Sequence, residues 1–482
     1  LFIPHGHEDH IGAIPYVLKQ VNMPIYCTRL TAGLIKLKLQ EHGLANTTKL
    51  ITVEAGQTVK AGKFLVEFIH VNHSIPDAVG LAIKCAGGTI VHTGDFKIDS
   101  TPIDGGMIDL ARFGQLGNEG VLCMLADSTN AERPGFTESE RKVGESFETL
   151  FRKAGDKRII VATFASNIHR VQQIIDVAQK LGRKVALSGR SLENVVAVSR
   201  ELGYLKVPEG VMLDLDLINK YSPHELVLIT TGSQGEPMSA LTRMATGDHR
   251  KVDIVPGDTV IISATPIPGN EKLVSRTIDN LYKLGANVVY EKSYGVHVSG
   301  HASQEELKLM HNLVRPTFFM PVHGEYRHLI KHAELAKSLG MSADNIVIGE
   351  NGNVIELTPC SFKVASKIPA GRLLVDGLGV GDVGNIVLRD RRQLSQDGIM
   401  IVVVTVDSVD CHVIAGPDIV SRGFVYVREA EDLMDEAREK VQAALEKCED
   451  QEITDWATMK GMVRDSLSKF LYERTRRRPM IL

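Results

Sequence analysis

The stretch His5-Gly6-His7-Glu8-Asp9-His10, which follows the apolar residues Leu1-Phe2-Ile3, decides how the rest of the chain is interpreted. It places three imidazoles and a carboxylate within six residues, directly after a predicted strand end. On such a loop His5 and His7 can face one metal ion while Asp9 and His10 turn toward a second. Neutral imidazole and carboxylate are ligands that zinc and manganese accept. Because so many titratable groups serve no evident purpose in a core without a cation, the stretch predicts a metal site.

A binuclear site needs more ligands than one loop provides. Three candidates lie downstream: His73 in HVNHSIPD, Asp95 in HTGDFK and His323 in PVHGEY. A single histidine after a strand is more often a capping or surface residue. Each of these three follows a predicted strand, however, so its loop can direct the side chain to a common edge. We therefore predict that four loops converge on one site.

Length and composition describe an ordinary globular protein. At 482 residues the chain is too long for one hydrophobic core, and its hydrophobic and charged contents are 43% and 24%. The apolar run Ile399–Val406 is too short to span a membrane and is interpreted as a buried strand. The six cysteines form no C-x-x-C pair, which favours a reducing, cytoplasmic location.

The net charge of −4 gives no global attraction to nucleic acid. Local basic clusters at Lys153–Arg158, Arg389–Arg392 and Arg474–Arg478 can follow a phosphate backbone, although such clusters are more often solvated helix ends or turns. Composition alone therefore does not indicate a nuclease.

The order of predicted strands and helices along the chain predicts an α/β protein of several domains. Short strands with few helices occupy residues 1–137, including Phe64–Val71, Gly80–Gly87, Thr89–Phe96 and Val121–Ser128. Strands and helices alternate through residues 138–296, which is typical of βαβ units around a parallel sheet. Histidine-bearing loops return at 297–360. A Gly-rich linker is expected at 361–380, and a small α+β domain at 381–482.

At this point the motifs resemble a known family. HGHEDH matches the HxHxDH motif of the metallo-β-lactamase superfamily. NHSIPD, TGDFK, ADSTN, GHASQEE and PVHGEYR are similar to the further motifs of its β-CASP branch in the ribonuclease J form. The resemblance extends along essentially the whole chain, including Gly377–Arg392 and the final RTRRRPMIL. It implies an αββα sandwich with an inserted β-CASP α/β domain and a C-terminal α+β dimerisation domain.

Carried over residue by residue, the resemblance implies two divalent metal ions, with zinc expected and manganese the alternative. His5, His7 and His73 would hold one ion. Asp9, His10 and His323 would hold the other, and Asp95 would bridge both. The implied catalytic residues are Asp127 in ADSTN, His301 in SGHAS, and Asp95. Without the family, Asp127 would be interpreted as a turn-former and His301 as a surface residue.

The scaffold alone does not name the substrate, because β-lactam, thioester and DNA hydrolysis use it too. The inserted domain would close over the metals, and His323 occupies a position where RNA-processing relatives carry histidine. The implied activity is 5′-3′ exonuclease and endonuclease cleavage of single-stranded RNA, in rRNA maturation and mRNA decay, giving 5′-phosphate products.

Substrate-binding candidates lie on the loops Thr230–Pro237 and His297–Ser303, whose backbone N–H groups can meet phosphates or simply form turns. The resemblance implies that Ser233, His297, Ser299 and His301 contact the nucleotide or its 5′-monophosphate. The expected partners are RNA and further subunits, as a homodimer or tetramer that can include a paralogue, without a membrane.

The family also carries an N-terminal segment with an acidic motif, and Leu1 is expected to lie downstream of it. Pro4 stands where many relatives have threonine. Two alternatives stay open: a DNA nuclease or other hydrolase on the same scaffold, and a non-catalytic RNA-binding subunit.

Overall fold

The computed structural model describes residues 1–482 except 105, 291, 377–378, 382–383, 408–411, 426–430, 452 and 454. The chain divides into two compact units, Leu1–Pro369 and Ala370–Leu482. The Gly-rich part of the predicted linker therefore falls partly outside the described residues.

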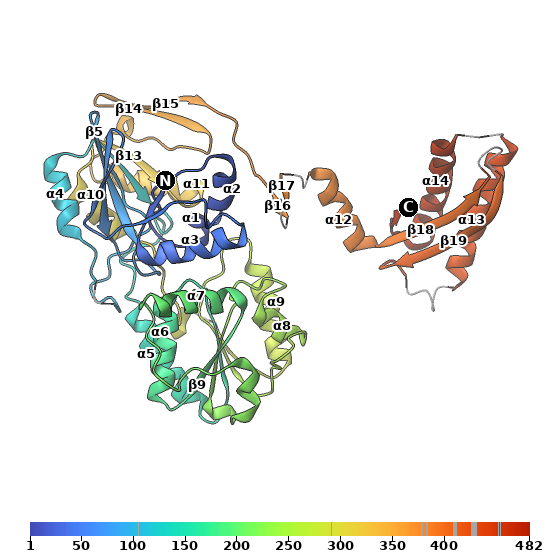
Figure 1. Cartoon of the computed structure of the whole chain (residues 1–482), viewed down its shortest axis with the longest axis horizontal. Coiled ribbons are helices and arrows are strands. Elements are labelled where there is room, and N and C mark those ends of the chain that lie inside the picture. Colours follow the sequence, from blue (N-terminus) through green and yellow to red (C-terminus); the bar gives the residue numbers. More distant parts are fainter. Residues whose placement is uncertain are drawn as a thin grey trace. The chain divides into compact units, whose positions relative to one another are not determined.

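A six-stranded mixed sheet forms the centre of the first part of the larger unit (Figure 1). Its strand order is β13-β7-β6-β5-β4-β3. The neighbours from β3 to β6 are antiparallel, whereas β7 is parallel to both β6 and β13. The strands are β3 Thr58–Ala61, β4 Phe64–His70, β5 Val79–Cys85, β6 Gly88–His92, β7 Cys123–Asp127 and β13 Phe318–Val322.

Apolar layers cover both faces of this sheet. On one face Val66, Phe68 and Leu81 pack toward the parallel pair β1 (Ile25–Cys27) and β2 (Leu50–Thr52). On the other face Phe113, Met124 and Phe319 lie in a core that includes residues of α4, α10 and α11. The helices of this part are α1 Glu8–Ile11, α2 Ile14–Gln20, α3 Arg29–Glu41, α4 Leu110–Glu119, α10 Gln304–Val314 and α11 Tyr326–Ser338.

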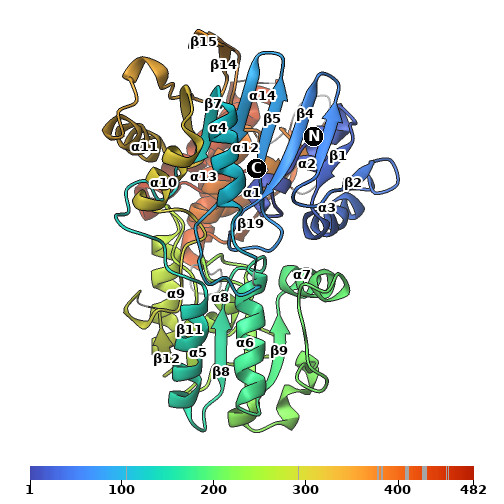
Figure 2. The ribbon, with the colours of Figure 1, turned by 90° about the vertical axis from the view of Figure 1, so that its left-hand side faces the viewer.

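A second, fully parallel sheet lies between β7 and β13 in the sequence, with strand order β12-β11-β8-β10-β9. Along β8, Ile159 and Val161 face one core while Ile160 and Ala162 face another, so both faces are buried. Helices α5 to α7 pack on the first face and α8 and α9 on the second; α5 and α6 run alongside the sheet in Figure 2. The elements are α5 Arg141–Ala154, β8 Ile159–Ala162, α6 Ile168–Lys180, β9 Lys184–Ser188, α7 Arg190–Glu201, β10 Leu226–Thr230, α8 Ala240–Thr246, β11 Thr259–Ile262, α9 Glu271–Lys283 and β12 Asn287–Val289.

The linker expected at 361–380 is wrong in its first part. Strand β15 (Ser361–Lys367) pairs antiparallel with β14 (Asn353–Thr358), and the Thr358 hydroxyl accepts a hydrogen bond from the Ser361 backbone N–H at 2.9 Å across the turn. Phe362 packs against Phe318, with ring centroids 5.5 Å apart. The Pro359-Cys360 turn joins these two strands, whereas a proline after a strand can also mark the start of a loop, so the local sequence did not reveal the hairpin.

The smaller unit is an α+β fold with a three-stranded sheet, order β19-β18-β20. Helices α13 and α14 cover it through a core that includes Met400, Val441 and Leu467. Its elements are β16 Val375–Asp376, β17 Gly379–Val380, α12 Asn385–Asp397, β18 Ile399–Val406, β19 Val413–Arg422, α13 Glu431–Asp450, α14 Trp456–Thr475 and β20 Met480–Ile481. Within the described part of the chain, no helix is long and apolar enough to cross a membrane.

Candidate metal centre

The candidate ligands follow strands that end at the same edge of the six-stranded sheet. Strand β4 runs in the same direction as β6, because each is antiparallel to β5, and β7 and β13 run parallel to β6. His73 follows β4, Asp95 follows β6, Asp127 ends β7 and His323 follows β13. In the register of β7 and β13, Val322 pairs with Asp127, which places His323 beside that aspartate. The strand ends thus meet the N-terminal histidine loop, as the sequence predicts.

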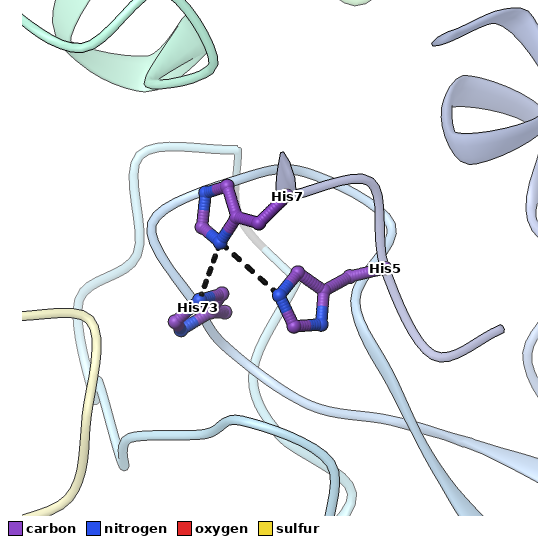
Figure 3. Close-up of side chains that lie close together, drawn as sticks. All are labelled: His5, His7 and His73. Atoms are coloured by element: carbon purple, nitrogen blue, oxygen red, sulfur yellow. Dashed lines mark hydrogen bonds between the residues drawn. The ribbon is translucent and has the colours of Figure 1, made fainter. Parts of the chain in front are cut away.

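One group of donors consists of His5, His7 and His73 (Figure 3). Nδ1 of His7 lies 3.1 Å from Nε2 of His5 and 3.0 Å from Nε2 of His73. Nδ1 of His73 lies 2.8 Å from the carbonyl oxygen of Gly300. Because a carbonyl can only accept, Nδ1 of His73 carries the proton and Nε2 presents its lone pair to the cluster. Such a carbonyl contact is how proteins fix the tautomer of a metal-binding histidine.

The environment keeps these imidazoles neutral. Burial lowers the pKa of His7 to about 4. Burial and the neighbouring histidines lower the pKa values of His5 and His73 well below their usual range. Neutral imidazole is the form that binds a metal, and three ring nitrogens directed at one another are electrostatically costly without a cation between them. The donor set therefore fits a divalent ion.

A second group of donors consists of Asp9, His10, Asp95 and His323. The Oδ2 atom of Asp95 lies 3.2 Å from Nε2 of His10 and 3.4 Å from Nε2 of His323. The same oxygen lies 3.6 Å from Nε2 of His5, in the first group. Asp95 is 3% exposed, so this carboxylate is buried between the two groups. Its position suits a ligand shared by two cations.

Thr129 holds His323 in place. The Thr129 hydroxyl donates to Oδ1 of Asp127 at 2.8 Å, so its oxygen is free to accept from Nδ1 of His323, also at 2.8 Å. Nε2 of His323 then faces Asp9 and Asp95. Burial lowers the pKa of His323, but hydrogen bonds to Asp127 and Asp9 raise it more strongly, to about 11. The site thus concentrates negative potential where His323 lies, which also favours a metal cation.

Asp127 and His301 form a pair beside the donor groups. Oδ2 of Asp127 accepts from Nδ1 of His301 at 2.7 Å. Burial lowers the pKa of His301, but the charge and hydrogen bond of Asp127 raise it to a net value above normal. Burial raises the pKa of Asp127, whereas the charge of His301 and its hydrogen bond lower it well below the usual range. The pair therefore favours an imidazolium held by a carboxylate, which is a proton donor.

The predicted substrate-binding residues Ser233, His297 and Ser299 differ in burial and in hydrogen-bond partners. Ser299 accepts hydrogen bonds from Nδ2 of Asn130 and the backbone of His301, so it supports the loop that carries His301. His297 accepts from the buried Arg170 at 2.8 Å. Ser233 is buried just after β10 in the five-stranded sheet. Their contact with a nucleotide remains a prediction.

The basic clusters are partly engaged within the fold. Arg158 binds the carboxylate of Asp258 at 2.5 Å, and Arg477 lies 3.4 Å from Asp397. Arg389 is paired with its neighbour Asp390 at 3.3 Å. Arg389 therefore fits the solvated-end interpretation, whereas Arg158 is mostly buried in its ion pair and serves the fold.

Sequence reasoning missed the residues behind the ligands, chiefly Thr129, Asn130 and the Gly300 carbonyl. Thr129 and Asn130 belong to the ADSTN motif, so the motif itself was the available signal. No pattern indicated that the Gly300 carbonyl meets His73, because these residues lie 227 positions apart.

Four family models match the chain in succession. They are the beta-lactamase superfamily domain over residues 1–111, the ribonuclease J beta-CASP domain over 156–281, the Zn-dependent metallo-hydrolase RNA specificity domain over 285–348, and the ribonuclease J C-terminal domain over 386–482. Their order agrees with the architecture described above.

Several curated proteins are similar over the full chain. Ribonuclease J2 of Bacillus subtilis (strain 168) is 45% identical over 483 residues, covering 100% of this chain and 86% of that protein. Ribonuclease J 1 of Streptococcus pyogenes serotype M3 is 46% identical over 482 residues, with the same coverage. Ribonuclease J of Synechocystis sp. is 47% identical over 427 residues, covering 88% of this chain and 66% of that protein.

A crystal structure of a protein of unknown function from Enterococcus faecalis V583 is also similar, with a TM-score of 0.50 and 16% identity over 72% of this chain and 79% of that one. At this identity it supports the fold alone. The fold class and the enzyme class predicted from the sequence, a hydrolytic ribonuclease, are confirmed by the family matches. With 45% identity along its entire length to one such protein, the chain belongs to the ribonuclease J family.

Proposed function

We propose that this chain is a metal-dependent ribonuclease that hydrolyses single-stranded RNA, both from a 5′-monophosphorylated end in the 5′ to 3′ direction and at internal sites. The observation that carries the proposal is the buried Oδ2 atom of Asp95, which lies between two groups of imidazoles, beside the Asp127–His301 pair. Membership of the ribonuclease J family supports RNA as the substrate, with rRNA maturation and mRNA decay as the processes served.

One divalent ion would be held by His5, His7 and His73, and the other by Asp9, His10 and His323. Asp95 would bind both ions. Zinc is the expected metal, and the same nitrogen and oxygen donors also accept manganese. When bound, such ions supply Lewis acidity, which neutralises charge on a phosphodiester and lowers the pKa of a water molecule near phosphorus.

The chain's own residues complete the reaction. As the water oxygen bonds to phosphorus it releases a proton to solvent, the bond from phosphorus to the 3′-oxygen breaks, and the 3′-oxygen needs a proton. His301 would donate it, because Asp127 favours the protonated ring and directs Nε2 away from itself. The products would be a 3′-hydroxyl and a 5′-phosphate. Water then reprotonates His301 for the next cycle.

Ser233, His297, Ser299 and His301 would contact the nucleotide or its 5′-phosphate. Arg170 supports this assignment for His297: the guanidinium is fully buried, binds Glu140 through two hydrogen bonds of 2.9 Å, and donates to Nδ1 of His297. His297 is thereby fixed in one orientation. We further propose that the enzyme works in the cytoplasm as a homodimer or tetramer, which can include a paralogue, through residues 381–482.

The test compares the purified chain with His7→Ala, and with His42→Ala as a control outside the donor groups. Metal content and cleavage of labelled single-stranded RNA and DNA of one sequence are measured for each. We expect His7→Ala to lose metal and RNA cleavage while His42→Ala keeps both. A preference for DNA would favour a DNA nuclease, and RNA binding without cleavage would favour a non-catalytic subunit. Unchanged cleavage in His7→Ala would refute the metal role.

A further inference from the structure

Glu306 is a buried carboxylate in the first turn of α10, with no exposed surface. Together with Ser303 it forms a capping box at the start of that helix: Oε2 accepts from the Ser303 backbone N–H at 2.8 Å. A capping box needs only the two local contacts between Ser303 and Glu306 and works equally well on an exposed helix. It does not explain why the carboxylate is buried.

Two further hydrogen bonds explain the burial. Oε2 of Glu306 also accepts from the backbone N–H of Thr137 at 2.6 Å, and Oε1 accepts from that of Ile98 at 2.7 Å. These partners lie 169 and 208 positions away in the sequence. A buried carboxylate is costly unless its oxygens are satisfied, and here three backbone donors satisfy it. Glu306 therefore joins three segments that are remote in sequence.

Each segment carries part of the candidate metal centre. Ile98 lies three residues after Asp95, and the intervening Lys97 donates its backbone N–H to Asn72, the neighbour of His73, at 2.8 Å. The Ile98 contact thus supports the loops of two proposed ligands together.

The other two segments hold the loop of residues 299–303. The hydroxyl of Thr137 donates to the carbonyl oxygen of His301 at 2.7 Å, and Ser303 lies two residues after His301. In the same loop, the carbonyl oxygen of Gly300 accepts from Nδ1 of His73. One loop therefore presents the proposed proton donor and orients a proposed ligand, and Glu306 restrains it from both sides.

We propose that Glu306 is a positioning residue of this enzyme: through the Ile98, Thr137 and Ser303 amides, its carboxylate sets the His301 loop against the Asp95 and His73 loops. This inference rests on the proposed function. Glu306 touches neither the donor atoms nor the Asp127–His301 pair, so it acts through the backbone. It determines the relative position of the proton donor and the ligands.

Glu306→Gln tests the carboxylate at constant size. A carboxamide has one acceptor oxygen, and its NH2 group cannot accept, so at least one of the two remote amides loses its partner. We expect kcat on single-stranded RNA to fall about 10-fold to 100-fold and KM to stay within about twofold, as for supporting residues of metal sites. Glu306→Asp keeps the charge and should restore part of kcat. Glu305→Gln, one residue earlier and half-exposed, is the matched control and should behave as wild type.

Two measurements do not depend on activity. Zinc affinity, measured by competition with a chelating dye, should weaken in Glu306→Gln and remain normal in Glu305→Gln. Hydrogen exchange of the Ile98 and Thr137 amides should accelerate in Glu306→Gln alone. If wild type bound zinc but did not cleave RNA, the proposed function would fail while these two measurements still tested Glu306.

Unchanged kcat, zinc affinity and exchange in a folded Glu306→Gln variant would overturn the positioning role. An equal loss of folded protein in Glu306→Gln and Glu306→Asp would also overturn it, because the residue would then serve the stability of the fold alone.

Discussion

Replacing Asp127 by asparagine changes one charge at the site and keeps its shape. The carboxylate accepts from Nδ1 of His301 at 2.7 Å and, through Oδ1, from the backbone and hydroxyl of Thr129 at 3.0 and 2.8 Å. In the variant the carboxamide oxygen would keep the two Thr129 contacts. Its NH2 group would then face His301, so the protonated ring would lose its acceptor.

The expected loss follows from that one hydrogen bond. Asp127 is 2% exposed, and a hydrogen bond to a charged group in such a place contributes about 1.5–3 kcal/mol. If this stabilisation is needed to protonate the leaving oxygen, kcat falls by about 10-fold to 150-fold. KM and metal content should stay near wild type, because the carboxamide keeps the site's shape and the donor groups remain intact.

The assay is steady-state cleavage of a 5′-phosphorylated single-stranded oligoribonucleotide, with metal content measured on the same preparations. Asp104→Asn is a matched control, since Asp104 lies 3.4 Å from His169 in an aspartate–histidine pair outside the donor groups. It should leave kcat unchanged. A kcat of Asp127→Asn within about twofold of wild type would refute the proton-donor role. A loss of metal in proportion to activity would instead make Asp127 a ligand.

Three further changes test the surroundings of the site. Thr129→Val removes the acceptor for Nδ1 of His323 and should weaken zinc binding about 10-fold or more, whereas Thr129→Ser should bind zinc as wild type does. Equal zinc affinities in wild type and both variants would contradict the hydrogen-bond role. Gly300→Ala would place a Cβ 2.8 Å from the His73 ring and should lower zinc affinity similarly, whereas Gly371→Ala, which meets nothing within 4 Å, should not. Burial lowers the pKa of His311 to about 4, so the folded state resists a proton that the unfolded chain accepts below its pKa of about 6.5. Stability is therefore lost as pH falls. Between about pH 7.5 and about pH 5.5 the free energy of unfolding of wild type, measured with urea, should fall by about 1.3 kcal/mol more than that of His311→Gln. Parallel plots of unfolding free energy against pH would refute this.

The positions of the candidate ligands could be predicted because two things determine them: the motifs in the sequence and the direction of the strands that precede them. His73, Asp95 and His323 each follow a strand, and strands of one direction deliver their loops to one edge. The clustering of these three residues is therefore a consequence of topology. Their binding of metal is still a prediction.

Other structural features could not be predicted because the local sequence favoured a different structure. Helix α4 contains Gly114 and Gly117, which lower helix propensity, yet a Cβ at Gly117 would lie 2.0 Å from the carbonyl oxygen of Leu313. The glycine allows α4 to approach α10 closely, which no pattern in α4 alone reveals. Strand β19 contains Gly416-Pro417, which usually marks the end of a strand, but the strand continues to Arg422 past a register shift opposite Val403 and Thr405.

The backbone conformation of His323 also could not be predicted from the local sequence. This residue has φ of 58°, a left-handed conformation that non-glycine residues seldom adopt. Contacts from Asp9, Thr129 and Asp127 surround its ring, so the tertiary structure holds a conformation that the local sequence disfavours. Such positions are where propensity is least informative.

The pairing of β13 with β7 joins residues almost two hundred positions apart. Closing so long a loop is entropically costly and slow, and the whole five-stranded domain lies within it. During synthesis on the ribosome, a chain that has emerged only as far as β12 still lacks both His301 and His323. The proposed proton donor His301 and the proposed ligand His323 would therefore join the site only after the inserted domain has emerged, so RNA cleavage would begin after that domain has had time to fold.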